Sequence, residues 1–353
     1  MFKLMNTTEL LRKIVSIQSF SGGEQERADF MAGYLTDEGL SVRRIGNNIF
    51  ARVGCGREGA PTVMLNSHLD TVHPSAGYTF DPFDPPYDAG IVFGLGSNDA
   101  GGAVVSMTAA ALHFLRHGGL AFDLLLLLSA EEETSGVNGI SLALQHAGRV
   151  DCAIIGEPTR MKAAVAERGL LVLDGVASGV SGHAARGEGE NAIYKALSDI
   201  ETLRNHRFAR VSPLMGEVKL TVTQISAGTQ HNVVPDKCTF VVDIRPTDLY
   251  TNEEIWRELQ AEVASELTSR SLANRSSATP AGHPLIQCAG ALGIGTYISP
   301  TSSDWMRTGG IPAVKMGPGD SARSHAADEY ITVAELKAGA EGYIDFLKNL
   351  KLT

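Results

Sequence analysis

The chain has 353 residues, of which 43% are hydrophobic and 20% charged, and it carries a formal net charge of -10. This length favours about two domains, because a single hydrophobic core rarely grows beyond about 250–300 residues. The composition excludes disordered, collagen-like and coiled-coil proteins, and the acidic balance without a basic stretch argues against nucleic acid or an anionic membrane as a partner. The 4 cysteines lie far apart, so neither a disulfide framework nor a cysteine-based zinc site is predicted.

The apolar segments give no sign of a membrane span or an export signal. The longest run of large apolar residues, 124–128, is much shorter than the about 20 residues that a membrane helix needs. Residues 1–6 lack the apolar core of a signal peptide. We therefore expect a cytoplasmic protein that does not act at a membrane.

The first part of the chain alternates between helical and strand patterns. Helices are predicted over residues 10–17, 24–40, 101–117 and 140–146. Strands are predicted over residues 49–53, 63–65, 124–128 and 152–155. Residues 124–128 are apolar at every position, as a strand covered on both faces requires. The order of these elements predicts an α/β fold with a mostly parallel sheet sandwiched by helices.

The pattern changes after about residue 164 and returns to αβ texture near residue 281. Between them, strands are predicted over residues 218–225 and 238–244 and helices over residues 191–203 and 253–267. This set suits a small α+β sandwich with its helices on one face, and residues 276–282 are the best linker candidate. We predict a catalytic domain in two parts, 1–167 and 281–353, with an inserted domain over 168–280.

Chemically distinctive residues follow the ends of the predicted parallel strands. His68 follows the strand at 63–65, and Asp70 lies two residues further on. In an extended segment these two side chains point the same way, so Asp70 can accept the second ring N–H of His68 and fix its tautomer, as metal-bound imidazoles require. A lone histidine at this position is more often a hydrogen-bonded structural residue, so the other candidates decide the interpretation.

A glycine-rich segment, residues 94–102, leads into the helix at 101–117 and contains Asp99. Two of its glycines resemble half of a dinucleotide-binding fingerprint. The third glycine is displaced, however, and Asp99 occupies the helix entry where a pyrophosphate would sit. Asp99 is therefore a helix cap or a ligand for a cation.

Further carboxylates and a histidine complete the candidate set. Three of these carboxylates, Glu131, Glu132 and Glu133, follow the apolar strand at 124–128, where αβ proteins bind ligands. Glu157 follows the strand at 152–155, and His325 lies near the end of the chain.

The net charge of these candidate residues indicates what kind of ligand they bind. Asp99, Glu133 and Glu157 bring three negative charges to one crevice, and their motifs contain no Lys or Arg. Converging carboxylates stay ionised only beside cations. Two Zn²⁺ ions per subunit, coordinated also by neutral His68 and His325, would balance three carboxylates and one hydroxide. Co²⁺ or Mn²⁺ are acceptable substitutes for such a donor set.

With these motifs in order, the chain resembles the co-catalytic zinc aminoacylase and peptidase superfamily over essentially its whole length. That superfamily contains acetylornithine deacetylase, succinyl-diaminopimelate desuccinylase and carboxypeptidase G. The resemblance implies that Asp99 bridges the two metals. The other implied ligands are His68 and Glu157 at one metal, and Glu133 and His325 at the other.

The resemblance also implies roles for residues outside the ligand set. Glu132 takes the place of the general base, and Asp70 takes the place of the ligand's orienting partner. His183, within residues 181–184, resembles a histidine that reaches across a dimer interface into the partner's active site. This implies a homodimer formed through the inserted lid domain.

Three residues are predicted to contact the substrate. Residues 230–235 and 243–245 resemble the superfamily's substrate-binding strands, with Asn232 to position oxygens and Arg245 to bind the α-carboxylate through its planar guanidinium. Asp304 is a candidate partner for a substrate ammonium, although a hydrogen-bonded loop is the more common role for such a residue.

The predicted activity is metal-dependent hydrolysis of the amide bond of a small-molecule N-acyl amino acid. The motifs after Glu133, Glu157 and His325 resemble most closely the deacylases of N-acetyl-L-ornithine or N-succinyl-L-ornithine in arginine biosynthesis. Residues 100–102 depart from the usual lysine-containing segment, which leaves a desuccinylase of succinyl-diaminopimelate, an N-acetylcitrulline deacetylase and a dipeptidase as alternatives. The sequence has no Gly-x-Ser-x-Gly elbow for a serine hydrolase, and a non-catalytic metal- or amino-acid-binding protein is the alternative of another class.

Overall fold

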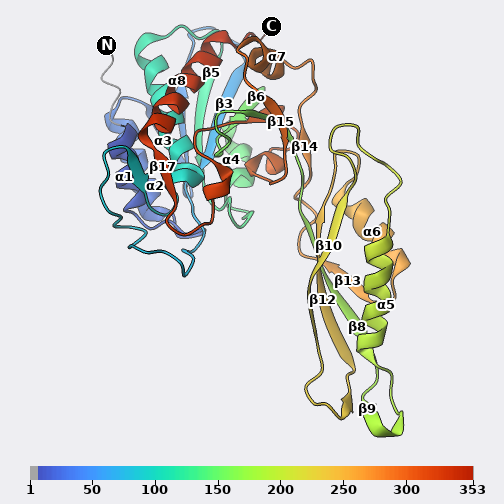
Figure 1. Ribbon diagram of the computed structural model, residues 1–353. Coiled ribbons are helices and arrows are strands. Elements are labelled where there is room, and N and C mark those ends of the chain that lie inside the picture. The colour runs from blue at the N-terminus through green and yellow to red at the C-terminus, as the bar shows by residue number, and fades with distance from the viewer. Residues whose placement is uncertain (1–6, 353) are drawn as a thin grey trace. The chain divides into compact units, whose positions relative to one another are not determined.

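The structure is a computed structural model that describes residues 7–352 (Figure 1). The observation on residues 1–6 therefore lies outside the described residues. The chain divides into two compact units. Among the described residues, unit 1 comprises 7–166, Ala278–Ser299 and 303–352, and unit 2 comprises Glu167–Ser277 and Pro300–Ser302. In the part of the chain described, no helix has the length and apolar character needed to cross a membrane.

A mixed sheet forms the centre of unit 1 (Figure 1). Its strands are β1 (Ser41–Ile45), β2 (Asn48–Val53), β3 (Thr62–His68), β5 (Asp123–Ser129), β6 (Cys152–Ile155), β7 (Ala163–Glu167), β14 (Ser277–Ala278), β15 (Thr296–Ser299) and β16 (Ala313–Lys315). The order is β1-β2-β5-β3-β6-β16-β7-β14, and β15 pairs with β7. The pairs β5–β3, β3–β6 and β6–β16 are parallel, whereas β1–β2, β2–β5 and β16–β7 are antiparallel.

Helices cover both faces of this sheet, which confirms the predicted α/β class. They are α1 (Thr7–Val15), α2 (Gln25–Asp37), α3 (Gly102–His117), α4 (Ile140–Ala147), α7 (Pro284–Ala291) and α8 (Val333–Asn349). A small ladder pairs β4 (Ile91–Phe93) with β17 (Tyr330–Thr332). Short helical turns at η1 (Ser97–Gly101), η3 (Asp304–Arg307) and η4 (Ser321–Arg323) connect these elements.

Strand β5 shows why its sequence is apolar at every position. Leu124, Leu126 and Leu128 belong to the core that α1, α2, α3, α7 and α8 build on one face of the sheet. Leu125 and Leu127 belong to a second core under α4 on the opposite face. Because successive side chains of a strand alternate in direction, burial on both faces requires an apolar residue at each position.

Unit 2 is a four-stranded antiparallel sheet with two helices. Its strands are β8 (Leu171–Ser178), β10 (Lys219–Ala227), β12 (Lys237–Arg245) and β13 (Glu266–Ser269), in the order β10-β12-β8-β13. Helices α5 (Ala192–Asn205) and α6 (Asn252–Glu262) share one core with alternate residues of β8 and β12. A second, two-stranded ladder joins β9 (Gly182–His183) to β11 (Val233–Val234), and η2 (Ala184–Arg186) follows β9.

The helix predicted over residues 253–267 is wrong at its end, because α6 stops at Glu262 and Leu267 lies in β13. Helical periodicity continues across this boundary, but the backbone amides of Ala264 and Ser265 donate to the Asp199 carboxylate at 3.2 and 2.7 Å. A side chain of α5 therefore replaces the acceptors that another turn of helix would supply, and the chain turns into the sheet.

Candidate active site

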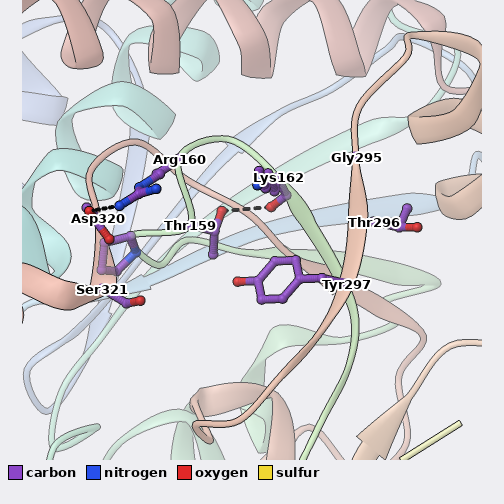
Figure 2. Close-up of a pocket in the computed structure, with 9 residues that line it drawn as sticks. Thr159, Arg160, Lys162, Gly295, Thr296, Tyr297, Asp320 and Ser321 are labelled. Carbon is purple, nitrogen blue, oxygen red and sulfur yellow. Dashed lines mark hydrogen bonds and ion pairs between the residues drawn. The ribbon is translucent and has the colours of Figure 1, made fainter.

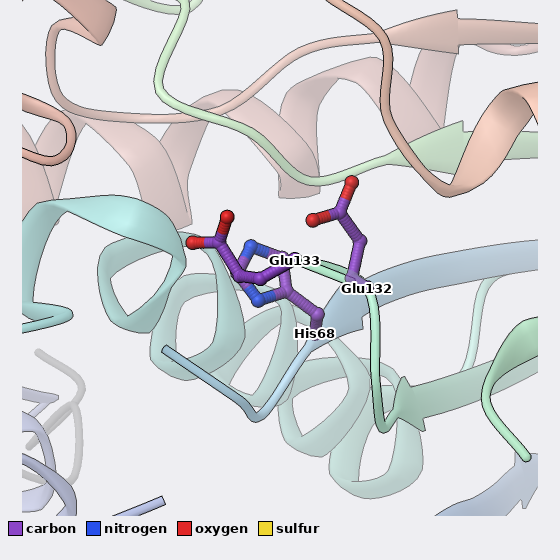
Figure 3. Close-up of side chains that lie close together, drawn as sticks. All are labelled: His68, Glu132 and Glu133. Atoms are coloured by element: carbon purple, nitrogen blue, oxygen red, sulfur yellow. The ribbon is translucent and has the colours of Figure 1, made fainter. Parts of the chain in front are cut away.

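The carboxyl ends of the central parallel strands carry the predicted ligands of unit 1. His68 is the last residue of β3, and the parallel register pairs it with Ser129 at the end of β5. Glu132 and Glu133 follow β5 and project beside the imidazole of His68 (Figure 3). Glu157 comes two residues after the end of β6, and β6 is the neighbour of β3 in the sheet. Parallel strands end at one edge of a sheet, so residues distant in sequence meet there.

Two groups of donor atoms share the carboxylate of Asp99. In each group the donor atoms lie within 4.8 Å of one another: His68, Asp99 and Glu157 form one, and Asp99, Glu133 and His325 form the other. Asp99 Oδ1 lies 3.3 Å from His68 Nε2, whereas Asp99 Oδ2 lies 3.9 Å from His325 Nε2. The two oxygens of one carboxylate therefore face two separate imidazoles, as a ligand that bridges two cations must.

The remaining distances complete the two groups. His68 Nε2 lies 3.9 Å from Glu157 Oε1, and His325 Nε2 lies 2.9 Å from Glu133 Oε2. The His68 side chain is 1% exposed and that of His325 is 54% exposed. A further group contains His68, Glu132 and Glu133. Two imidazoles and three carboxylates are donors that divalent transition metals accept, so the donor set fits the predicted metals.

Asp70 orients the base candidate as well as the histidine. Its buried carboxylate accepts the backbone N–H groups of Glu132 and Glu133 at 3.0 and 3.1 Å, and the Ser21 hydroxyl at 2.6 Å. His68 Nδ1 lies 2.9 Å from the backbone oxygen of Asp70 and 3.4 Å from its Oδ1. Bonded on that side, the imidazole presents Nε2 to Asp99 and Glu157.

The acidic side chains do not tolerate full ionisation by themselves. Burial, reinforced by neighbouring carboxylates, raises the pKa of Glu132 and of Glu157 well above the ordinary glutamate value. For Asp99, burial raises the carboxyl pKa, but the contact with His68 outweighs it and leaves the pKa lowered. A dry cluster of carboxylates is electrostatically complete only with added positive charge.

The negative charge of the carboxylates raises the pKa of both histidines. Burial lowers the pKa of His68, but its hydrogen bonds with Asp70 and Asp99 outweigh burial and hold the imidazole pKa well above its ordinary value. The hydrogen bond with Glu133 raises the pKa of His325 to about 9. Both shifts arise from the negative charge of the surrounding carboxylates, and the same charge favours a bound cation.

Comparison with known proteins shows the family to which this chain belongs. The model of the peptidase family M20/M25/M40 matches residues 64–349. The chain belongs to this family. It is therefore an M20 family hydrolase, and the resemblance to the co-catalytic aminoacylase and peptidase superfamily is confirmed.

Relatives and solved structures agree with the family match. A succinyl-diaminopimelate desuccinylase of Methylocella silvestris is 29% identical over 276 residues, which cover 72% of this chain and 69% of the relative. A tripeptidase of Staphylococcus aureus has the same fold, with a TM-score of 0.80 and 19% identity over 99% of this chain and 98% of that one. A dinuclear metal binding peptidase of Bacillus subtilis superposes with a TM-score of 0.72 and 16% identity over 98% and 97% of the two chains.

The three acidic residues after β5 are not equivalent in the M20 hydrolase. Glu131 bonds to Asn138, whose backbone and side-chain N–H groups donate to its carboxylate at 3.0 and 2.9 Å. Glu131 is also in the left-handed region, with a φ of 54°. The chain therefore holds Glu131 in its own loop, while Glu132 and Glu133 lie beside His68.

The residues predicted to contact the substrate from the inserted domain lie in unit 2. His183 and Asn232 are exposed neighbours on the β9–β11 ladder, where His183 pairs with Val233 and the Ala184 amide donates to the Asn232 carbonyl at 3.1 Å. The His183 ring nitrogen Nδ1 accepts the Ala185 amide at 3.2 Å.

Arg245 ends β12 and also belongs to unit 2. Its Nε and Nη2 atoms donate to the two carboxylate oxygens of Asp243 at 2.8 and 3.0 Å. The structure thus gives the guanidinium a carboxylate partner on its own strand. Contact between Arg245 and a substrate remains a prediction.

Asp304 occupies a buried position in unit 1. It begins η3, is 4% exposed, and accepts the Ser129 hydroxyl at 2.5 Å. Burial raises the pKa of this carboxyl to about 6. Its observed partner is therefore a residue of the protein, and the predicted contact with a substrate ammonium stays a prediction.

Buried charges behind the ligands were missed in the sequence. Arg27, 3% exposed, donates to the backbone oxygens of Leu69 and Ile17 at 2.9 and 2.7 Å. Glu24 is fully buried and accepts the Glu131 amide at 3.1 Å. The available signal was a charged residue at an apolar-face position of α2, because Arg27 lies four residues, about one helical turn, before the buried Met31.

A pocket of about 420 Å³ lies beside the segment that carries Glu157 (Figure 2). At its edge the Arg160 side chain turns toward Asp320 and pairs with its carboxylate, and the Arg160 amide donates to the Gly319 carbonyl at 2.7 Å. These bonds join the segment after Glu157 to the segment that leads to His325. The walls of the pocket therefore support two of the ligand-bearing segments.

Proposed function

We propose that this M20 hydrolase removes the acyl group from an N-acyl amino acid, with N-acetyl-L-ornithine or N-succinyl-L-ornithine of arginine biosynthesis as substrate. The observation that carries the proposal is the shared carboxylate of Asp99, whose oxygens face His68 and His325 separately. A site of this kind is suited to two cations and, with them, to amide hydrolysis.

Two Zn²⁺ ions are the proposed cofactors, with Co²⁺ or Mn²⁺ as substitutes. His68, Asp99 and Glu157 would hold one ion, and Asp99, Glu133 and His325 the other. When bound, the ions supply Lewis acidity that polarises the amide carbonyl and favours ionisation of water near neutral pH.

Glu132 is the proposed general base. Its backbone N–H is fixed by Asp70 at 3.0 Å, and burial raises its carboxyl pKa, which suits a group that takes up and returns a proton. In the proposed reaction Glu132 accepts a proton from the attacking water. It then donates that proton to the nitrogen of the leaving amino acid.

Residues of unit 2 are proposed to complete the site. His183, contributed by the partner subunit of a homodimer, would donate to the oxyanion of the tetrahedral intermediate. Arg245 would bind the α-carboxylate and Asn232 an acyl or carboxylate oxygen. Support for association through unit 2 comes from exposed apolar side chains on α5 and β10, where Tyr194 is 72% and Ile225 53% exposed.

A second candidate substrate is N-succinyl-diaminopimelate. It is favoured by the relatives named succinyl-diaminopimelate desuccinylase, two of which are 29% identical over 342 residues covering 87% of this chain. The reaction and the catalytic residues would be the same. Only the contacts with the acyl group and the amino-acid side chain would differ.

The test is a substrate panel in which release of free amine is measured as kcat/KM for the Zn²⁺-loaded protein. The panel contains N-acetyl-L-ornithine, N-succinyl-L-ornithine, N-succinyl-diaminopimelate, N-acetylcitrulline and dipeptides, and the Glu132→Gln variant controls for contaminating hydrolases. We expect the highest kcat/KM for an acyl-ornithine. A maximum for N-succinyl-diaminopimelate would establish the second candidate instead, and metal binding without turnover of any compound would favour a binding protein.

A further inference from the structure

A buried carboxylate in the last third of the chain holds the segment that carries Asp99. Glu329 lies four residues after His325 and is 2% exposed. Its Oε1 accepts the backbone N–H groups of Asn98 and Asp99 at 2.9 and 2.8 Å, and its Oε2 accepts that of Gly96 at 3.0 Å. Three backbone donors of one loop therefore converge on a single side chain.

The backbone of Glu329 contributes to the same attachment. Its carbonyl oxygen accepts the Gly94 amide at 2.9 Å, next to the β4–β17 ladder in which Tyr330 pairs with Phe93. The loop before Asp99 is thus bound at both ends to the segment after His325. Because both oxygens of the Glu329 side chain accept backbone N–H groups of this loop, the backbone of Asp99 is held by more hydrogen bonds than an ordinary turn supplies.

Asn98 links the two segments a second time. Its Nδ2 donates to the Asp320 carbonyl at 3.1 Å, and its Oδ1 accepts the Asp320 amide at 2.9 Å. A Cβ added to Gly319 would lie 2.3 Å from Asn98 Oδ1, so the backbone approaches this side chain closely. The Asp99 loop and the segment leading to His325 consequently form one hydrogen-bonded body.

From this network we propose that Glu329 is a positioning residue for the metal centre, which sets the Asp99 carboxylate between His68 and His325. This inference rests on the proposed function, because it concerns how the two cations are held. A bridging carboxylate serves both sites only if each oxygen keeps its own direction, and the amide of Asp99 is bound directly to Glu329. Residues that orient metal ligands in this way typically change metal affinity about 10–100-fold when altered.

The test measures metal binding rather than turnover. Glu329→Gln preserves the shape of the side chain but leaves one acceptor oxygen for three donors, and its NH₂ group faces a backbone N–H. The full chain, stripped of metal with a chelator, is titrated with Co²⁺ by calorimetry and by visible absorption. We expect the Kd for Co²⁺ to rise about 10–100-fold in Glu329→Gln, with an altered ligand-field spectrum.

A matched control comes from unit 2. Glu254 also accepts backbone and hydroxyl donors, from Thr251 N and Oγ1 at 2.8 and 2.9 Å, in the capping box of α6. Glu254→Gln removes the same kind of interaction away from the ligand set, so its Co²⁺ affinity and spectrum should match those of the unaltered chain.

The outcomes separate this inference from the proposed function. Failure of the unaltered chain to bind Co²⁺ would overturn both. Normal binding by the unaltered chain and by Glu329→Gln, with identical spectra, would overturn the positioning role alone. If Glu329→Gln does not fold, Glu329→Asp, which keeps the charge but shortens the side chain, is measured in the same way, and unchanged affinity in that variant would also overturn the role.

Discussion

The two units hold their candidate functional residues in different ways. In unit 1 three of the ligand candidates lie at or just after strand ends, and buried carboxylates hold the neighbouring backbone; of these, Asp70 is 1% and Glu329 2% exposed. In unit 2, His183 on β9 and Asn232, the residue before β11, are exposed. Unit 1 therefore has the preorganisation expected of a site that performs chemistry, whereas the two candidate side chains of unit 2 are open to solvent.

The largest expected effect tests the chemistry assigned to unit 1. Glu132→Gln should lower kcat by about 10²–10⁴-fold because proton transfer is lost, while bound metal stays near the level of the unaltered chain. Metal content by mass spectrometry and kcat on the best substrate measure the two properties. Glu131→Gln is the matched control, since Glu131 bonds to Asn138, and equal activity of both variants would contradict the assignment.

The next effect tests whether unit 2 contributes to catalysis. His183→Ala should lower kcat by about 10²–10³-fold, as the loss of one oxyanion donor does, and leave metal content unchanged. Mixed dimers of a His183→Ala subunit and a Glu132→Ala subunit should regain part of the activity, because one of their two sites keeps both groups. Absence of any recovery in verified mixed dimers would count against a site shared between subunits.

A smaller effect is expected for the orienting carboxylate of unit 1. Asp70→Asn keeps the size of the side chain but replaces one of the oxygens that accept the amides of Glu132 and Glu133. Metal affinity measured by calorimetric titration of the stripped protein should fall about 10–100-fold. An unchanged Kd would show that His68 keeps its orientation without this carboxylate.

The smallest effect concerns substrate binding in unit 2. Arg245→Ala should raise KM about 10-fold with little change in kcat, because a carboxylate contact made equally in ground and transition states is lost. Arg270→Ala is the matched control, since Arg270 forms the same two-point pair with Asp174 at 2.8 and 2.7 Å. Equal KM values in the two variants would remove Arg245 from the substrate site.

Sequence patterns predicted what depends on local periodicity and on strand ends. The fully apolar run at residues 124–128 identified a central strand, because burial on both faces leaves no position for a polar side chain. The meeting of His68, Glu133 and Glu157 was predicted because parallel strands bring their carboxyl ends together and because unpaired carboxylates require cations. The places of Asp99 and His325 in the ligand set were implied by the resemblance to the superfamily.

Other features depend on partners distant in sequence. The end of α6 at Glu262 is set by Asp199 on another helix. Glu329 follows a recognised histidine, yet its role lies in bonds to backbone amides more than 200 positions away, as the separation of 230 from Asp99 shows. Every residue except proline has a backbone N–H group, so no pattern of residue types shows which of these groups a side chain will bind.

The inserted unit leaves and rejoins the sheet of unit 1 through neighbouring strands. β7 and β14 are adjacent, the Thr279 amide donates to the Val165 carbonyl at 3.0 Å, and the Leu170 amide donates to the Asn274 carbonyl at 3.0 Å. The entry and exit of about one hundred residues are thus one strand spacing apart, which a short hairpin turn would span equally well. A segment attached in this way can be lengthened or shortened without changing the pairing of β3, β5 and β6, the strands that carry or precede the ligand candidates His68, Glu133 and Glu157.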